Sequence, residues 1–394
     1  MNFINISPSF SSLFCLLICG YGVFSQEANT RELYLEPIFH VNYGDATADK
    51  PQSKSWTNQY GHWLIVGDGD GPKLLKKETT VWASQFEVNK AWQNLPSRAD
   101  VYSSGDEAHI VLVGECALNV VQITYSHQNK QYEHQWKESL PIPQDCQSLE
   151  TATITRDSKN QYWVCADVNQ KIMVWHSYNG KDWSEPIELA DNINRDDISL
   201  IVGLKDKVSV IWSDQNTQSI MERIHRDGEG PAHWSAPIIV QQGDNNADDH
   251  LNATIFGNGE MALVSKNSVD QIGQPQFVLR MRDKEGRWTN IPYEILTAQR
   301  SPSRPIINHV ESGEIFEVHA VKDRENNRYF ISVNEIKRRK DGWEFRELIQ
   351  LKTKIKGKNG DVTSSKASFL SNRPKLIFFS DDLGNIYSFD LDSL

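Results

Sequence analysis

The sequence predicts an all-β fold, a single β-propeller of seven four-stranded blades. A tryptophan follows a polar turn six times, at intervals of roughly 44 to 55 residues, which is about the length of one propeller blade. Short apolar or alternating segments, separated by Gly, Asn and Asp, fill each interval as antiparallel strands would. The 12 Trp, 12 Tyr and 15 Phe among 394 residues favour strands, and no long amphipathic stretch indicates a helix.

Each repeat contains four expected strands in chain order. The first strand follows an acidic or polar step, as in DDISLIVG at 196–203, and a strongly apolar second strand follows a turn, as in YWVCAD at 162–167. The third strand alternates, as in KIMVWHSY at 171–178, and a turn with Gly then leads to the tryptophan and the fourth strand. We expect each tryptophan to start the outer strand and to pack there, in preference to stacking on a sugar. These residues are Trp92, Trp136, Trp183, Trp234, Trp288 and Trp343.

Two segments remain outside the six tryptophan repeats. The segment ELYLEPIFHVN at 32–42 is a lone strand, and residues 364–391 supply three strands without a fourth. If the N-terminal strand is the outer strand of the last blade, the ring closes with seven blades and loses its exposed sheet edges. Rings of six or eight blades are the alternatives.

The first 25 residues resemble a secretory signal peptide. The apolar run LFCLLICGYGVF at 13–24 is too short to span a membrane, and the residues up to Ser25 fit a cleavage site before Gln26. A lipid anchor on Cys19 is the alternative. No later segment approaches the roughly 20 apolar residues of a membrane span. The propeller is therefore expected over residues 26–394, in a secreted or periplasmic protein.

Charge and cysteine content narrow the class of function. A formal net charge of -11 argues against a surface built for nucleic acid or for an anionic membrane. Three cysteines follow the signal segment, Cys116, Cys146 and Cys165, without the paired spacing of a zinc site. Since two of them end apolar segments, we expect buried thiols, in preference to one disulfide and one free thiol.

The segment SYNGKDW at 177–183 resembles an Asp-box, the Ser-x-Asp-x-Gly-x-x-Trp hairpin of sialidase-like propellers, with one residue fewer between Ser and Gly. Residues 283–288 and 341–343 repeat it more loosely. The resemblance is to the sialidase-like propeller superfamily and, loosely, to propeller polysaccharide lyases, and it implies structural hairpins away from the site. The Arg-Ile-Pro segment and the arginine triad of sialidases are not recognisable, so the resemblance implies no specific family.

Polar residues gather where first strands begin and second strands end, which in a propeller is the mouth of the central channel. Three neighbouring repeats contribute Asp196, Asp197, Asp248, Asp249, His250, Lys266 and Arg304.

An anionic sugar would find complementary chemistry at this mouth. Arg304 and Lys266 would neutralise a uronate carboxylate and ease removal of the adjacent proton, and His250 would be the general base. Asp249 and Asp197 would contribute to substrate binding. Such a β-elimination requires no metal and no other cofactor. Alternatively, the same residues form ion pairs between blades and caps on strands.

Other candidate ligands are less convincing as sites. His109 and His127 lie on successive strands, and we interpret them as ordinary histidines because no third metal ligand is evident. The run GDGDG at 67–71 is expected to form a tight hairpin rather than a calcium loop.

Two hypotheses from different classes follow. The first is a secreted enzyme, a polysaccharide lyase or a glycoside hydrolase, which acts as a monomer on an anionic, uronate-containing polysaccharide or oligosaccharide. The second is a non-catalytic propeller that binds glycans or proteins. Propellers host both classes, so the fold does not choose between them.

Overall fold

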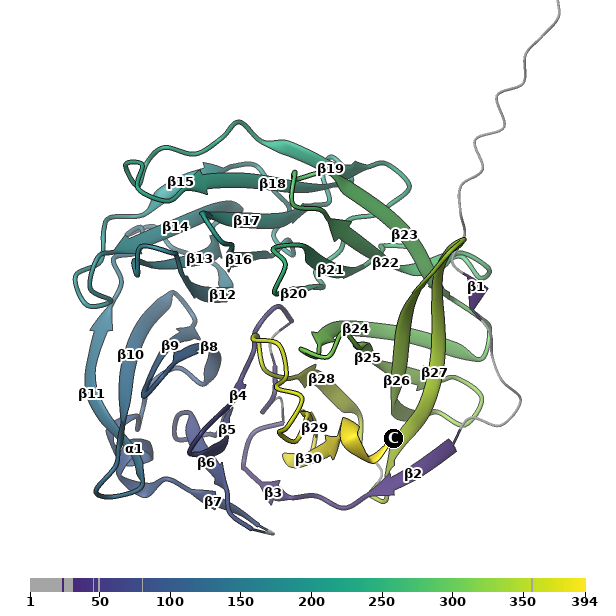
Figure 1. The fold of residues 1–394 in the computed structure, drawn as a ribbon, viewed down its shortest axis with the longest axis horizontal. Helices are drawn as coiled ribbons and strands as arrows, with labels where there is room; N and C mark the ends of the chain where they lie inside the picture. The colour runs from purple at the N-terminus through teal and green to yellow at the C-terminus, as the bar shows by residue number, and fades with distance from the viewer. Residues whose placement is uncertain (1–22, 25–30, 45, 49, 80, 356) are drawn as a thin grey trace, which may run out of the picture.

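The computed structural model describes residues 23–24, 31–44, 46–48, 50–79, 81–355 and 357–394. Seven antiparallel sheets stand side by side in a ring, with their first strands around a central channel (Figure 1). This arrangement confirms the predicted seven-bladed propeller.

The strands of each blade follow one another from the channel outward, and the blades follow chain order. The first three blades contain β4 (Ser55–Asn58), β5 (Gly61–Val66), β6 (Lys73–Lys77) and β7 (Trp82–Ser84); β8 (Arg98–Ser104), β9 (Glu107–Gly114), β10 (Ala117–Ser126) and β11 (Gln131–Ser139); and β12 (Leu149–Arg156), β13 (Tyr162–Val168), β14 (Lys171–Ser177) and β15 (Ile187–Ala190). Blades four and five contain β16 (Ser199–Gly203), β17 (Lys207–Asp214), β18 (Ser219–Arg226) and β19 (Ile238–Gln242); and β20 (Leu251–Ile255), β21 (Met261–Lys266), β22 (Pro275–Arg282) and β23 (Trp288–Ile295). Blades six and seven contain β24 (Arg300–His309), β25 (Ile315–Asp323), β26 (Arg328–Arg339) and β27 (Gly342–Thr353); and β28 (Asn359–Thr363), β29 (Leu376–Asp381) and β30 (Asn385–Asp390) with β3 (Phe39–His40).

The N-terminal strand closes the ring, as predicted. β3 pairs antiparallel with β30, with Phe39 opposite Ile386, so the last blade takes its outer strand from the other end of the chain. The expected single strand is divided in two, because β2 (Arg31–Leu35) pairs in parallel with β27 of blade six. Leu33 and Leu35 of β2 pack against the core there, and Pro37 follows, a residue that lacks the amide hydrogen needed to continue a ladder.

The predicted signal segment falls mostly outside the described residues. Its last described part, β1 (Val23–Phe24), pairs in parallel with β27. The proposed cleavage site before Gln26 and the alternative lipid anchor at Cys19 lie outside the described residues. No helix in the described part of the chain is long and apolar enough to cross a membrane.

Tryptophan side chains pack against apolar clusters at the interfaces between blades, as predicted. Trp136 and Trp183 pack against a cluster drawn from blades two and three, and Trp234 packs against one from blades three and four. The expected position at the start of the outer strand holds for Trp288, which begins β23. It is wrong for Trp136, which lies inside β11, and for Trp92, which is fully buried and follows the short helix α1 (Phe86–Ala91) after the outer strand of blade one.

The turns before the fourth strands of blades three and four, called the rim turns here (residues 177–184 and 226–235), share one hydrogen-bonding scheme. The indole Nε1 of Trp183 donates to the carbonyl of Gly180 over 3.0 Å, and that of Trp234 donates to Pro231 over 3.0 Å. The next residue, Ser184 or Ser235, accepts a hydrogen bond from an amide of the third strand. Gly180 has a φ of 77°, a conformation that favours glycine.

The expectation of buried thiols is wrong for two of the three cysteines. Cys116 and Cys146 form a disulfide, and Cys165 is the free, buried thiol, as in the alternative of one disulfide and one thiol. The cause is local, because Cys116 lies in the β9–β10 turn with a φ of 48° instead of ending a buried strand. There it meets the segment that leads from blade two to β12.

Candidate functional site

The first strands of the blades begin at one end of the channel, and we call this end the channel mouth. Residues 248–250 directly precede β20, and Asp197 lies two residues before β16. The structure brings together His250, Asp249 and Lys266 of the predicted site, linked through Asp248. The mouth residues discussed below are Lys50, Glu150, Asp196, Asp248, Asp249, His250, Lys266, Arg304 and Asp361.

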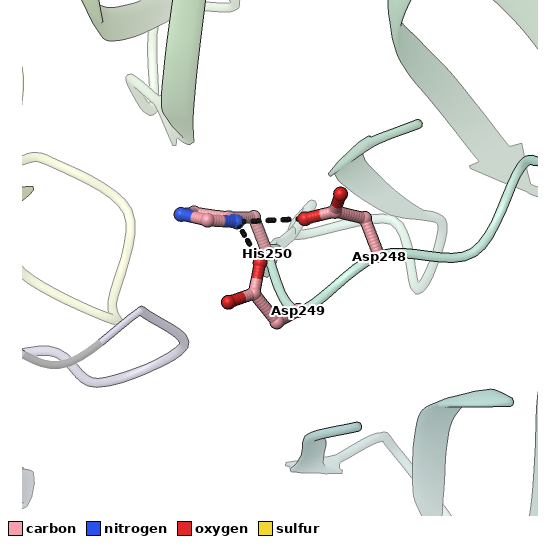
Figure 2. A group of neighbouring side chains, drawn as sticks. All are labelled: Asp248, Asp249 and His250. Carbon is pink, nitrogen blue, oxygen red and sulfur yellow. Dashed lines mark hydrogen bonds and ion pairs between the residues drawn. The ribbon is translucent and has the colours of Figure 1, made fainter. Parts of the chain in front are cut away.

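His250 is the centre of the cluster. Its Nδ1 lies 3.0 Å from Asp248 Oδ1 and also contacts Asp249 Oδ1, so two carboxylates share one ring nitrogen (Figure 2). Nε2, at the opposite side of the ring, points away from both carboxylates (Figure 2). It is buried and has no hydrogen-bond partner among the described residues. A polar ligand in the mouth could supply the hydrogen-bond partner that Nε2 lacks.

Asp248 is held by groups from the end of the second strand. Lys266 Nζ lies 2.8 Å from Asp248 Oδ2, and the hydroxyl of Ser268 donates to the same oxygen over 3.1 Å. Lys266 therefore neutralises a carboxylate of the protein itself. Its predicted role toward a substrate carboxylate remains a prediction, and the structure shows that this charge already has a partner.

Lys50 is a mouth residue that the sequence analysis missed. It belongs to the connection between β3 and β4, which Thr47 anchors to blade seven by donating to the carbonyl of Asp361 over 2.7 Å. Lys50 Nζ lies 3.0 Å from Glu150 Oε1 of blade three and also contacts Asp249 of blade five. One ammonium thus joins carboxylates from two blades that are not neighbours. No periodic pattern marks this connection, so the sequence offered no signal for it.

The same network drives the pKa values of two aspartates apart. Burial would raise the pKa of Asp249, but hydrogen bonding by His250 and Asp248 and the positive charges of His250 and Lys50 hold it well below its ordinary value. The pKa of Asp196 is raised, first by burial and then by the negative charge of Asp249. One carboxyl group therefore stays ionised to lower pH than an ordinary aspartate, while the other takes up a proton at higher pH than an ordinary aspartate.

The environment of His250 favours its charged form. Burial would lower the pKa of the imidazole, but hydrogen bonds and charge from Asp248 and Asp249 outweigh burial and raise it. A raised pKa makes a histidine a poorer general base at neutral pH, because a larger share of the imidazole is already protonated.

The structure places the other two predicted site residues away from the His250 cluster. Asp197 is fully buried and accepts hydrogen bonds from the amides of Asn194, at 2.7 Å, and Gln215, at 3.0 Å. Burial raises its pKa to about 6. Arg304 lies at a bulge in β24 and forms an ion pair with Asp361 of β28. Asp197 therefore shapes the turn before β16, and Arg304 joins blades six and seven.

Three mouth residues could together hold a metal ion. Asp248, Asp249 and His250 each offer a ligand atom, and these atoms lie within 4.8 Å of one another. Lys50 and Lys266 contact the same two carboxylates, so the chain supplies positive charge where a cation would sit. Bound metal would have to displace these ammonium groups, and the residues present fit a metal poorly for that reason.

The remaining candidates are not assembled into a site. His109 is buried with its pKa lowered to about 3 by burial, and its ring packs against Tyr162. His127 is exposed and lies 3.0 Å from Asp106. The run at 67–71 forms the turn between β5 and β6, where Asp68 accepts hydrogen bonds from the amides of Asn42 and Gly69. The predicted tight hairpin is confirmed.

Comparison with known proteins gives the fold. No family model and no curated protein sequence matches the chain. Among solved structures, a protein from Lactobacillus plantarum is similar over 89% of this chain and 92% of its own, with 11% identity and a TM-score of 0.50. An α-L-arabinanase of Penicillium chrysogenum, solved with arabinobiose, has a TM-score of 0.45 at 11% identity, over 77% of this chain and 98% of its own. The NanB sialidase of Streptococcus pneumoniae has a TM-score of 0.37 at 13% identity, and the match covers 71% of this chain and 49% of the sialidase.

Sialidase and arabinanase propellers thus stand among the structures that this chain resembles. At these identities and TM-scores the likeness assigns no family, and the propeller fold rests on the strand order of the chain itself. The function has to be argued from the mouth itself.

Proposed function

We propose that the chain is an exported glycoside hydrolase that cleaves a polysaccharide at the channel mouth. The observation that carries the proposal is the pair of carboxyl groups from adjacent blades whose pKa values are shifted in opposite directions. Glycoside hydrolysis requires such a pair, one protonated carboxylic acid and one carboxylate, on either side of the scissile bond.

Each carboxyl group has a role that follows from its environment. Asp196 is exposed and has a raised pKa, so it would act as the general acid that protonates the leaving oxygen. Asp249 stays ionised beside His250 and Lys50, so it would act as the nucleophile that attacks the anomeric carbon while the leaving oxygen takes the proton of Asp196. Glu150 shares Lys50 with Asp249 and would help to hold the ammonium in place.

His250 would act as a positioning residue in this reaction. As an imidazolium it fixes Asp249 and keeps it ionised, while its buried Nε2 hydrogen could donate to a sugar hydroxyl in the mouth. Elimination from a uronate is supported less well, because that reaction needs a neutral base and cations free for the substrate. Both Lys266 and Arg304 already contact carboxylates of the chain.

The disulfide supports export. Disulfides persist in secreted and periplasmic proteins and are rare in reducing compartments, so Cys116–Cys146 agrees with the predicted signal peptide.

A panel of polysaccharides tests the proposal. The purified protein is incubated with neutral polymers, such as arabinan and xylan, and with polygalacturonate, while reducing ends and the ultraviolet absorbance of unsaturated uronates are followed in parallel. We expect reducing ends without new absorbance on at least one polymer. New absorbance would identify a lyase and overturn the hydrolase, and silence in both channels would favour the non-catalytic propeller.

A further inference from the structure

A cavity of about 690 Å³ opens between blades six and seven, apart from the His250 cluster. Its walls come from β2, from the turn between β25 and β26 with the start of β26, and from the end of β27 with the segment that leads into β28. It lies at the end of the propeller where the mouth is. Two lining residues show this. Asp323 lies opposite Arg300, the first residue of β24, in the strand register, and Lys358 directly precedes β28.

Aromatic rings form part of the lining. Tyr34 of β2 is 47% exposed, and Tyr329 of β26 also lines the cavity, whereas Phe330 is buried behind it. Recognition sites for small ligands commonly combine such apolar and aromatic walls with a few polar groups that fix orientation. Asn327 supplies a polar group of this kind, and so does Asn326, whose side-chain NH2 also donates to Asp323 over 2.8 Å. A sugar ring, with one apolar face and a hydroxylated edge, matches this combination.

Two of the cations in the lining already have partners. Lys352 Nζ lies 2.5 Å from Glu32, and Lys354 forms an ion pair with Glu36, so both hold the N-terminal segment against blade six.

The other two cations in the lining, Arg328 and Lys358, have no ion pair within the described part of the chain. The two carboxylates of the lining, Asp323 and Asp382, form no ion pair with them. Asp323 accepts hydrogen bonds from the amides of Glu325 and Asn326, and Asp382 accepts one from the amide of Lys358. Both carboxylates are engaged in holding their own turns. Arg328 and Lys358 therefore line the cavity as exposed cations without an ion-pair partner among the described residues, as cations would in a site for an anionic group.

We infer that this cavity is a subsite for an acidic sugar residue, whose anionic group contacts Arg328 and Lys358 while its ring packs on Tyr34. The inference rests on the proposed function only in taking a polysaccharide as the ligand. It places recognition of negative charge beside the mouth, where cations are available, rather than at Lys266 and Arg304. A polymer cleaved at the mouth could then be selected by the charge of a residue further along its chain.

Binding of defined oligosaccharides tests the inference. Calorimetry compares oligogalacturonate, its fully methyl-esterified form, which lacks the charge, and a sulfated galactan oligosaccharide. We expect oligogalacturonate to bind about tenfold or more tightly than the ester, because charge-assisted hydrogen bonds contribute that much. Preference for the sulfated ligand over both galacturonate forms would assign the anion as sulfate and still support an acidic sugar. Equal binding of the acid and its ester would overturn the inference.

A matched pair of double variants ties the binding to the cavity. Arg328→Gln with Lys358→Gln should weaken oligogalacturonate binding about tenfold, because the two cations without partners are lost. The control combines Lys205→Gln with Arg226→Gln, which removes two exposed cations of blade four and should leave binding unchanged. Unchanged binding in the first pair, or equal losses in both, would overturn the inference.

A single substitution in the cavity tests the inference without removing two charges at once. An activity assay then separates this inference from the proposed function. Tyr34→Ala removes an exposed ring and should weaken binding of the acid severalfold, whereas Tyr178→Ala, also exposed, should not. Equal effects of the two tyrosine variants would count against the cavity. Hydrolysis of a neutral polymer should survive the cavity variants, so failure of acid binding alone would leave the hydrolase standing. If the protein binds oligogalacturonate but hydrolyses no polymer, the proposed hydrolase is wrong and the acidic-sugar subsite stands.

Discussion

The rim turns and the channel mouth belong to the same blades, yet they are organised in opposite ways. At the rim, Trp183 and Trp234 donate to turn carbonyls over the same 3.0 Å, and a serine follows each of them to accept from the third strand. At the mouth, blade three contributes Glu150 and blade five contributes Asp249 and His250, and the blades share little beyond the Asp-Asp pair before β16 and before β20. Repetition thus builds the ring, and the departure from repetition concentrates charged groups where a ligand can reach them.

Substitution of Asp249 gives the largest expected effect. Asp249→Asn should lower kcat on the active polymer about 10³-fold or more, because an amide cannot act as the ionised carboxylate. The matched control is Asp283→Asn near the rim, where the carboxylate pairs with exposed Arg287 and touches no mouth residue. Initial rates at saturating substrate, with circular dichroism to show intact folding, measure the difference.

If Asp249→Asn and Asp283→Asn lower kcat equally, the carboxylate at the mouth has no special role in the reaction. Unchanged turnover in Asp249→Asn would show that another carboxyl group carries the reaction.

The disulfide should have the next largest effect, and on stability. Cys116→Ser with Cys146→Ser should lower the free energy of unfolding by about 3 kcal/mol, because the crosslink restrains a loop with a sequence separation of 30 residues in the unfolded chain. Urea titration of both proteins measures the change, and a reductant should weaken the wild type while leaving the variant unaffected. A response of the variant to the reductant would mean that the crosslink is not the cause.

Removal of a rim tryptophan should cost less. Trp183→Ala should lower the free energy of unfolding by about 2 kcal/mol, since a half-buried ring leaves the interface of blades two and three. Tyr178→Ala in the same turn, where the ring is 69% exposed, should change it by less than about 0.5 kcal/mol. Both values come from urea titration. Turnover below the unfolding transition should match the wild type in both variants, and a selective loss in Trp183→Ala would extend the functional region to the rim.

The pH dependence of the reaction should show the smallest effect, about tenfold per pH unit on one side of the profile. An acid catalyst must be protonated, and the raised pKa of Asp196 means that kcat/KM falls only as pH rises through that higher value. Asp196→Asn should be slower and should lose this basic limb, whereas Asp191→Asn, a nearby exposed residue, should retain it. A basic limb that persists in Asp196→Asn would assign the acid elsewhere.

The fold could be predicted from sequence because its signals repeat. Six tryptophans and their turns fixed the blade period, and the strand left over at 32–42 pointed to closure of the ring. The helix before Trp92 was not predicted, because a helix of six residues is too short to show a periodic pattern in the sequence. The disulfide escaped because the two cysteines come from different connections whose approach depends on the folded blades.

The mouth was only partly predictable. Position at the start of a first strand located His250 and Asp249, but the sequence prediction took His250 for a general base and missed that Asp248 and Asp249 raise the pKa of its imidazole. Lys50 could not be found in this way, because it reaches the mouth from a connection whose path is set by contacts with distant blades. The sequence also could not predict which cations form ion pairs with carboxylates of the chain, and these ion pairs decide which cations remain available to a ligand.

The pairing of β3 with β30 also sets the order in which the blades can be completed as the chain is made. Synthesis delivers β3 early, whereas its partner is among the last strands to be made. Blades one to six can each form from hairpins that are close in sequence, but β3 must wait with an unpaired edge until residues 385–390 exist. A chain that ends before residue 385 would leave β3 without its partner and the ring open, so closure of the ring depends on the last strand of the chain.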